Sequence, residues 1–135
     1  MFRAVLYART AAADPARIAE QFAACRNTAV RAGWRVESEH SDDGRGATST
    51  DRSGLRAALS ALGPDAVLVV SDLARLARDM SDLVAIANDI EACRASLHCV
   101  DGTDINAIRA MIAPETGDTR LARRRNLAQR ARTSN

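Results

Sequence analysis

The sequence contains no lysine, few aromatic residues and only three cysteines. All 19 basic residues among its 135 are arginines, and aromatic residues make up 3% of the chain. Any anion site must therefore use guanidinium groups, which keep their charge and offer several hydrogen-bond donors. Cys25, Cys93 and Cys99 are an odd number of cysteines in a chain without an export signal. We therefore expect reduced thiols rather than disulfides.

Long apolar runs and metal-ligand patterns are also missing. No stretch approaches the ~20 consecutive apolar residues that a membrane helix needs. The short apolar run over residues 1–8 is interrupted by Arg3 and lacks the flanks of a signal peptide. We expect a cytoplasmic protein without a membrane partner. His40 and His98 stand apart from any metal-ligand spacing, so no metal site is expected.

Positive charge is concentrated at the end of the chain. The formal net charge is +2, yet residues 118–135 carry six arginines and one aspartate, so the preceding part is net negative. A cationic tail on a slightly acidic domain indicates contact with a polyanion, or a disordered segment kept soluble by its charge. The arginines of this tail are Arg120, Arg123, Arg124, Arg125, Arg130 and Arg132.

Hydrophobic patterning alternates between strands and helices. Apolar or alternating runs predict strands over residues 3–8, 34–41, 66–70 and 96–100. Asp14-Pro15 is typical of a helix start and Gly33 of a helix end. Further helices are expected from the apolar stripes Leu55/Leu59/Leu62, Leu83/Ile86/Ala87/Ile90 and Ile105/Ile108/Ile112.

Strands that alternate with helices favour one α/β domain with a mainly parallel sheet of about four strands and helices on both faces. Pro114 and Gly117 interrupt the pattern after the last expected helix. We therefore expect a domain over residues 1–113 and an arginine-rich tail over residues 114–135.

Each expected strand ends in polar or charged residues. In parallel α/β sheets, ligands bind at the carboxyl ends of the strands. Those strand exits are Arg9-Thr10, Asp42-Asp43, Ser71-Asp72 and Asp101. Arg52, Arg75 and Arg78 add guanidinium groups, and we expect Arg75 and Arg78 to share one face of a helical turn. Several arginines beside a few carboxylates favour a phosphate-bearing ligand, with ordinary surface arginines as the alternative.

Several ordered blocks resemble one protein family. They are Tyr7-Ala8-Arg9-Thr10, Glu20-Gln21, Gly33-Trp34-Arg35-Val36, Ser41-Asp42-Asp43-Gly44, Asp51-Arg52-Ser53-Gly54-Leu55 and the run from Val69 to Arg78. In order and spacing the chain resembles the N-terminal catalytic domain of the resolvase/invertase family of serine site-specific recombinases. The resemblance implies a resolvase-like fold.

The resemblance also implies a chemistry. In that family a serine attacks a DNA phosphodiester, an arginine cluster binds the scissile phosphate, and no metal or nucleotide cofactor takes part. Carried over position by position, the residues expected at or near the phosphate are Arg9, Arg52, Arg75, Arg78, Gln21 and Asp42.

Three positions depart from the family pattern. Ala11 stands where the nucleophilic serine is expected, Ala74 replaces an acidic residue, and Arg45 replaces a loop serine. Alanine has no oxygen with which to attack phosphorus. We therefore predict a DNA-binding or regulatory pseudoenzyme that does not cleave DNA by the family route.

Two alternatives stay open. One is an active recombinase or nickase that uses Thr10, although in an extended chain Thr10 points away from the side that position 11 faces. The other is a protein-interaction remnant that binds no nucleic acid. The expected partners are DNA, contacted weakly at its backbone by the cluster and the tail arginines, and a second copy of the chain or an intact recombinase.

Overall fold

The computed structural model describes residues 1–44 and 52–112, with side chains up to residue 108. The elements in chain order are β1 (Arg3–Arg9), α1 (Pro15–Ala32), β2 (Arg35–Asp42), α2 (Ser53–Ser60), β3 (Ala66–Val70), α3 (Leu73–Leu76), α4 (Met80–Ala92), β4 (Ser96–Cys99) and α5 (Ile105–Ile112). Met1–Thr103 forms one compact unit, and α5 belongs to a second that begins at Asp104. Among the described residues, no helix is both long and apolar enough to cross a membrane.

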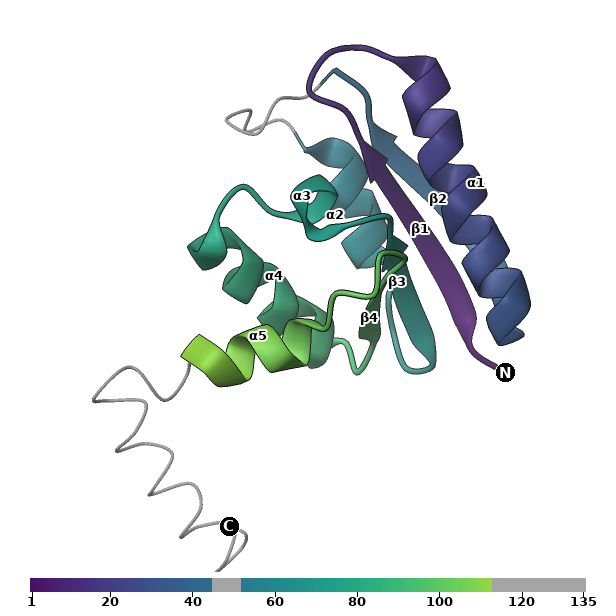
Figure 1. Cartoon of the computed structure of the whole chain (residues 1–135). Coiled ribbons are helices and arrows are strands. Elements are labelled where there is room, and N and C mark those ends of the chain that lie inside the picture. The colour runs from purple at the N-terminus through teal and green to yellow at the C-terminus, as the bar shows by residue number, and fades with distance from the viewer. Residues whose placement is uncertain (45–51, 113–135) are drawn as a thin grey trace, which may run out of the picture. The chain divides into compact units, whose positions relative to one another are not determined.

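The first unit is built on a four-stranded parallel sheet in the order β2-β1-β3-β4. Helix α1 lies on one face, and α2, α3 and α4 lie on the other (Figure 1). The predicted α/β fold is thereby confirmed. The chain runs outward from β1 to β2 and returns past β1 to β3, so its direction reverses between β1 and β3. Loops diverge at such a reversal and leave a crevice at the carboxyl ends of the two strands.

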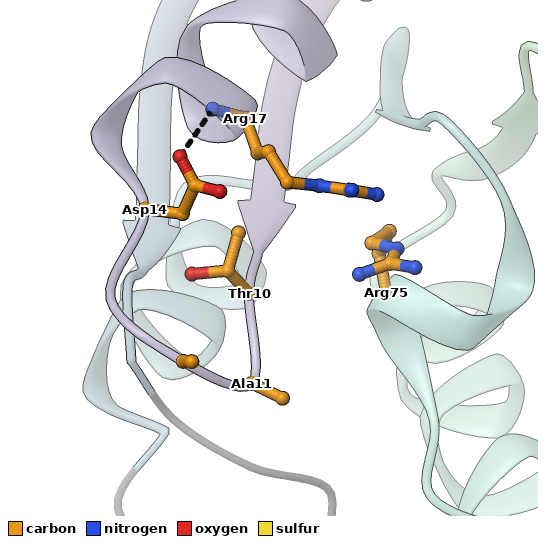
Figure 2. Close-up of a pocket in the computed structure, with 6 residues that line it drawn as sticks. Thr10, Ala11, Asp14, Arg17 and Arg75 are labelled. Carbon is orange, nitrogen blue, oxygen red and sulfur yellow. Dashed lines mark hydrogen bonds between the residues drawn. The ribbon is translucent and has the colours of Figure 1, made fainter.

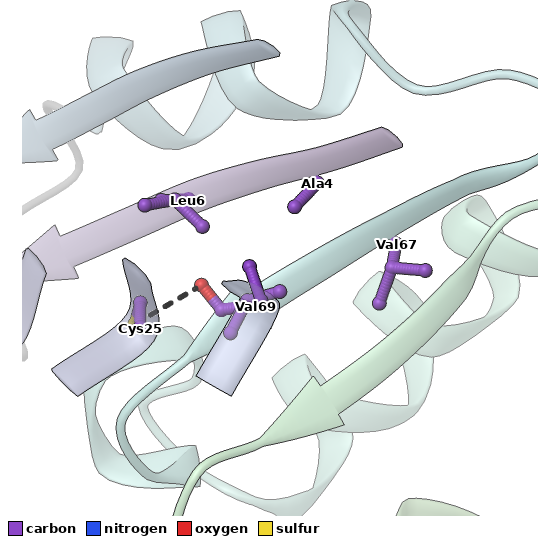
Figure 3. Close-up of a cluster of buried hydrophobic side chains, with 6 residues drawn as sticks. Ala4, Leu6, Cys25, Val67 and Val69 are labelled. Atoms are coloured by element: carbon purple, nitrogen blue, oxygen red, sulfur yellow. Dashed lines mark hydrogen bonds between the residues drawn. The ribbon is translucent and has the colours of Figure 1, made fainter. Parts of the chain in front are cut away.

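The core follows from the apolar runs that predicted the central strands. All five residues of β3 and all but the first of β1 are buried, as expected for strands covered on both faces. Alternate residues of both strands, among them Leu6 and Val69, pack against Cys25 and Ala29 of α1 (Figure 3). The intervening residues, such as Tyr7, point to the opposite face because side chains alternate along a strand.

Helix α1 has the boundaries that its sequence signals predict. Asp14 is the N-cap, and its carboxylate accepts a hydrogen bond of 3.2 Å from the Arg17 backbone N–H. Pro15 occupies the first turn, where its missing N–H costs nothing. Gly33 ends the helix with φ +79°, a conformation that strains residues with a side chain.

The region after β3 differs from the prediction. A single helical turn, α3, ends at Ala77, whose backbone is extended. Arg78 therefore lies outside the helix that carries Arg75, and the predicted common helical face of these two arginines is wrong. The physical reason is that one helix ends and another begins within residues 76–80. Leu76 is fully buried and fixes α3, whereas Asp79 caps the next helix, α4, by accepting a hydrogen bond of 2.8 Å from the Asp82 N–H.

Gly54, in the first turn of α2, allows a test of how closely α2 packs against the end of β2. A Cβ built at Gly54 would lie 2.2 Å from the carbonyl oxygen of Ser41 and 2.9 Å from the carboxylate of Asp42. Gly54→Ala should therefore destabilise the protein by about 1–3 kcal/mol through overpacking, although alanine is the better helix former by about 1 kcal/mol. Urea unfolding measures the change.

A matched control lies in the same helix. Ser60 is exposed at the end of α2, so Ser60→Ala should change the unfolding free energy by less than about 0.5 kcal/mol. A Gly54→Ala protein as stable as the wild type would contradict the close approach of α2 to the end of β2.

Candidate functional site

A pocket of about 270 Å³ opens at the carboxyl end of β1, at the crevice where the sheet reverses direction. Three of its residues follow the strand, two come from the start of α1, and one comes from α3. They are Thr10, Ala11, Ala12, Asp14, Arg17 and Arg75. Figure 2 shows the Arg17 side chain extending from α1 toward Arg75 on the other side of the pocket. Two guanidinium groups from different elements therefore face one space.

Ala11 and Thr10 have different roles at this strand exit. Ala11 is exposed and brings only a methyl group to the pocket. Thr10 is 3% exposed, and its hydroxyl donates to Asp43 Oδ1 and accepts a hydrogen bond of 3.1 Å from the Gly44 N–H. These hydrogen bonds connect the end of β1 to the end of β2, so the Thr10 hydroxyl stabilises the contact between the two loops.

Asp43 completes this connection. The hydrogen bond from Thr10 and a second of 2.8 Å from the Asp14 backbone N–H hold the pKa of the Asp43 carboxyl below its ordinary value. Asp43 is therefore a carboxylate at neutral pH. Because it accepts hydrogen bonds from both Thr10 and Asp14, it holds the two ends of the loop that contains Ala11.

Arg9 is buried and bonded to the backbone of α3. Its guanidinium donates hydrogen bonds of 3.1 Å to the carbonyl of Arg75 and 2.6 Å to the carbonyl of Ala74. Arg75 returns a bond of 3.1 Å to the carbonyl of Arg9. The two arginines therefore lock α3 against the end of β1.

Gln21 holds the other side of Arg9. Its side-chain amide accepts from the Arg9 N–H and donates to the Arg9 carbonyl, both at 3.0 Å. Arg75 reaches the pocket and is 25% exposed, whereas Arg9 is 7% exposed and does not line it. Gln21 thus holds Arg9, and Arg9 in turn holds the backbone of α3 that carries Arg75.

Arg52 and Arg78 meet at a carboxylate that the sequence analysis did not single out. Asp82 Oδ2 lies 2.9 Å from Arg52 Nη1, 2.8 Å from the Arg78 backbone N and 3.6 Å from Arg78 Nε. Arg52 also donates to the carbonyl of Leu76. This network joins the start of α2 to the end of α3 and the start of α4.

The same network sets the charge of Asp82. Burial, the largest single effect, raises its pKa, but hydrogen bonds from the Arg78 N–H and the Arg52 guanidinium together bring the pKa below its ordinary value. The Nε of Arg52 is buried and has no hydrogen-bond partner among residues 1–44 and 52–108.

Asp42 anchors the start of α2. Its carboxylate, 3% exposed, accepts bonds of 2.8 Å from the Gly54 N–H, 3.0 Å from the Leu55 N–H and 2.6 Å from the Tyr7 hydroxyl. Arg52, at the N-cap, makes no side-chain capping bond, so Asp42 satisfies the first N–H groups of α2 instead. Burial and the bond to Asp42 raise the pKa of Tyr7 above its ordinary value.

The structure thus divides the expected cluster into two pairs. Arg9 and Arg75 bond to each other, and Arg52 and Arg78 share Asp82. Arg17 was missed. Its only signal in the sequence was its place in the helical turn directly after a strand exit. The tail arginines and Arg45 lie outside the described residues.

Metal and thiol chemistry find no support in the part of the chain that the structure describes. No group of three or more His, Cys, Asp or Glu side chains there could hold a metal ion. Burial raises the pKa of the Cys25 and Cys99 thiols to about 12, so neither is a ready nucleophile.

The Asp82 network predicts a pH-dependent stability. Asp82→Asn should lower the unfolding free energy at pH 7 by about 1.5–3 kcal/mol, because hydrogen bonds to a charged group are lost. Since the folded pKa of Asp82 lies below the unfolded value of about 3.9, the advantage of the wild type is complete above that pH. It shrinks as pH falls through the folded pKa.

Urea unfolding of both proteins from pH 7 down to pH 2.5 checks this. The exposed residue Glu20 provides the control, and Glu20→Gln should change stability by less than about 0.5 kcal/mol. A wild-type advantage that stays constant down to pH 2.5 would contradict the role of the Asp82 charge.

Comparison with known proteins agrees with this architecture. Residues 4–133 match the family model described as "Resolvase, N terminal domain". At 19% identity, similar solved structures include the N-terminal catalytic domain of TP901-1 integrase, with a TM-score of 0.64 over 73% of this chain and 78% of that one. The C-terminal catalytic domain of ISC1926 TnpA, an IS607-like serine recombinase, is 19% identical, with a TM-score of 0.65 over 90% of this chain and 93% of that one. A resolvase family site-specific recombinase from Streptococcus pneumoniae is also 19% identical, with a TM-score of 0.62 over 98% of this chain and 99% of that one. No curated protein matches.

The family match covers nearly the whole chain, and the order of the parallel sheet agrees with it. The chain therefore belongs to the resolvase family of serine recombinases, and residues 4–133 correspond to the N-terminal domain of that family.

Proposed function

We propose that this protein is a cytoplasmic DNA-binding or regulatory member of the resolvase family that does not cut DNA by the serine route. The observation that carries the proposal is Ala11. It lines the pocket beside Arg75, at the position where the family resemblance has the attacking serine. A methyl group cannot attack phosphorus, whereas a guanidinium beside it can still hold a phosphate.

Recombinase domains of this family act on DNA and form oligomers. For this chain, the arginines on the surface support contact with a DNA backbone. Arg75 and Arg78 keep 25% and 42% of their side chains exposed, and we assign phosphate contact to them. Arg9 and Arg52 hold these two residues in place through the backbone of α3 and through Asp82. A second copy of the chain or an intact recombinase is the proposed protein partner.

The salt dependence of DNA binding should report how many phosphates the protein neutralises. The affinity for a DNA duplex should fall steeply with salt, since each phosphate neutralised contributes roughly −0.9 to the slope of log K against log salt. Arg78→Ala should make that slope shallower by about 1. Fluorescence anisotropy with a labelled duplex measures the affinity and its salt slope. The salt concentration is varied between about 25 and 200 mM, the range over which such contacts become screened.

Arg56 is the control for this experiment, because it is an exposed arginine on α2 outside the pocket and the Asp82 network. Arg56→Ala should leave the slope unchanged. A wild-type protein that retains no duplex at the lowest salt would favour the alternative of a protein-interaction remnant.

The absence of cleavage is tested on its own. After incubation with supercoiled plasmid and quenching in detergent, we expect no DNA covalently attached to the protein and no relaxed or nicked plasmid. The physical reason is that the Thr10 hydroxyl, the alternative nucleophile, is buried and bonded to Asp43 and Gly44.

An intact serine recombinase with its own target site provides the positive control. A covalent adduct with the present chain would contradict the proposal. Its loss in Thr10→Val would then identify Thr10 as the nucleophile of a recombinase or nickase.

A further inference from the structure

Arg17 is the second arginine of the pocket, and the family resemblance gives it no role. It lies in the first turn of α1 and is exposed. Its backbone N–H is held by the carbonyl and the carboxylate of Asp14, at 3.1 and 3.2 Å. No acceptor among the described residues bonds to its guanidinium. The base of the side chain is therefore fixed, whereas its five donors remain available on the pocket side (Figure 2).

Arg75 faces Arg17 with part of its bonding capacity used. Its Nη1 donates to the Arg9 carbonyl, and its Nε lies 3.4 Å from Asp72 Oδ1. These contacts orient the guanidinium at the pocket wall. Two cations directed at one space repel each other, and an anion placed between them is attracted by both, which offsets that repulsion.

The remaining lining favours a bulky anion. Ala11 and Ala12 have the smallest side chains that still carry a Cβ, so a sugar–phosphate chain can approach the guanidinium groups closely. The pocket lies at the start of α1, where the positive end of the helix dipole adds to the charge of the arginines. The opposing feature is the carboxylate of Asp14, which lines the same pocket and repels an anion.

We propose that Arg17 is a phosphate-binding residue and that it grips a DNA backbone phosphate together with Arg75 across this pocket. The assignment rests on the proposed function, because DNA is the ligand. It adds a contact from α1 that the sequence resemblance does not supply. Asp14 then limits the affinity, since its charge opposes that of the ligand.

The test uses three variants of the full chain and a labelled duplex. Arg17→Ala should weaken binding about 10- to 100-fold at low salt, the effect of one charge-assisted hydrogen-bond contact, and make the salt slope shallower by about 1. Arg31→Ala is the matched control. Arg31 is exposed in the last turn of the same helix, about 21 Å away at 1.5 Å per residue, and its replacement should change neither quantity.

Asp14→Asn gives a readout that a purely structural role does not predict. Asparagine caps a helix as well as aspartate does, so α1 is preserved while the negative charge is removed. The affinity should rise about 2- to 5-fold at low salt and converge on the wild-type value at high salt. Circular dichroism confirms that each variant is folded.

The outcomes separate the two proposals. If the wild type binds the duplex but Arg17→Ala and Arg31→Ala have equal effects, or Asp14→Asn leaves the affinity unchanged, the role of Arg17 is overturned and the proposed function stands. If the wild type does not bind DNA at all, the proposed function itself fails.

Discussion

The buried guanidinium of Arg9 is the interaction on which the rest of the site depends. A charged group that is 7% exposed is costly unless its donors are paired. Here the carbonyls of Ala74 and Arg75 accept from it, and both belong to the backbone of α3. The exits of β1 and β3, which are neighbours in the sheet, are thereby joined. One wall of the pocket is fixed relative to the other before any ligand arrives. Because the acceptors are backbone atoms, this lock does not need an acidic side chain at position 74.

Sequence patterns predicted the parts of this molecule that local physics controls. The apolar runs of β1 and β3 and the Asp14-Pro15 start of α1 depend on neighbours in the chain, so the structure agrees with them. Contacts between distant segments could not be predicted in the same way. The pairing of Arg52 with Asp82 spans 30 residues, and the approach of Arg17 to Arg75 exists only because the sheet reverses between β1 and β3. The end of α3 before Arg78 depends on the burial of Leu76, which a short polar stretch does not reveal.

A guanidinium group can serve structure and ligand binding at once, because it has five donors in a fixed plane. Arg75 illustrates this division: some of its donors orient it on Arg9 and Asp72, and its surface still lines the pocket. Arg52 lies at the structural extreme, with 12% of its side chain exposed and bonds to Asp82 and Leu76. Arg17 lies at the other extreme. Exposure to solvent, which contact with any ligand requires, therefore differs among these arginines and does not follow from their place in the family pattern.

This division explains how the chain can keep the fold and the pocket with an alanine at position 11. The methyl group of Ala11 is exposed and closes no network, so the absence of a hydroxyl there has no cost for the fold. Thr10, one residue earlier, joins the exits of β1 and β2 through Asp43 and Gly44. Arg9 and Arg52 are likewise needed for packing. Their presence in a chain with Ala11 is accounted for by stability alone, so it is no evidence of DNA binding. That evidence must come from the exposed cations, Arg17, Arg75 and Arg78, whose guanidinium groups the fold leaves in reach of solvent and hence of a phosphate.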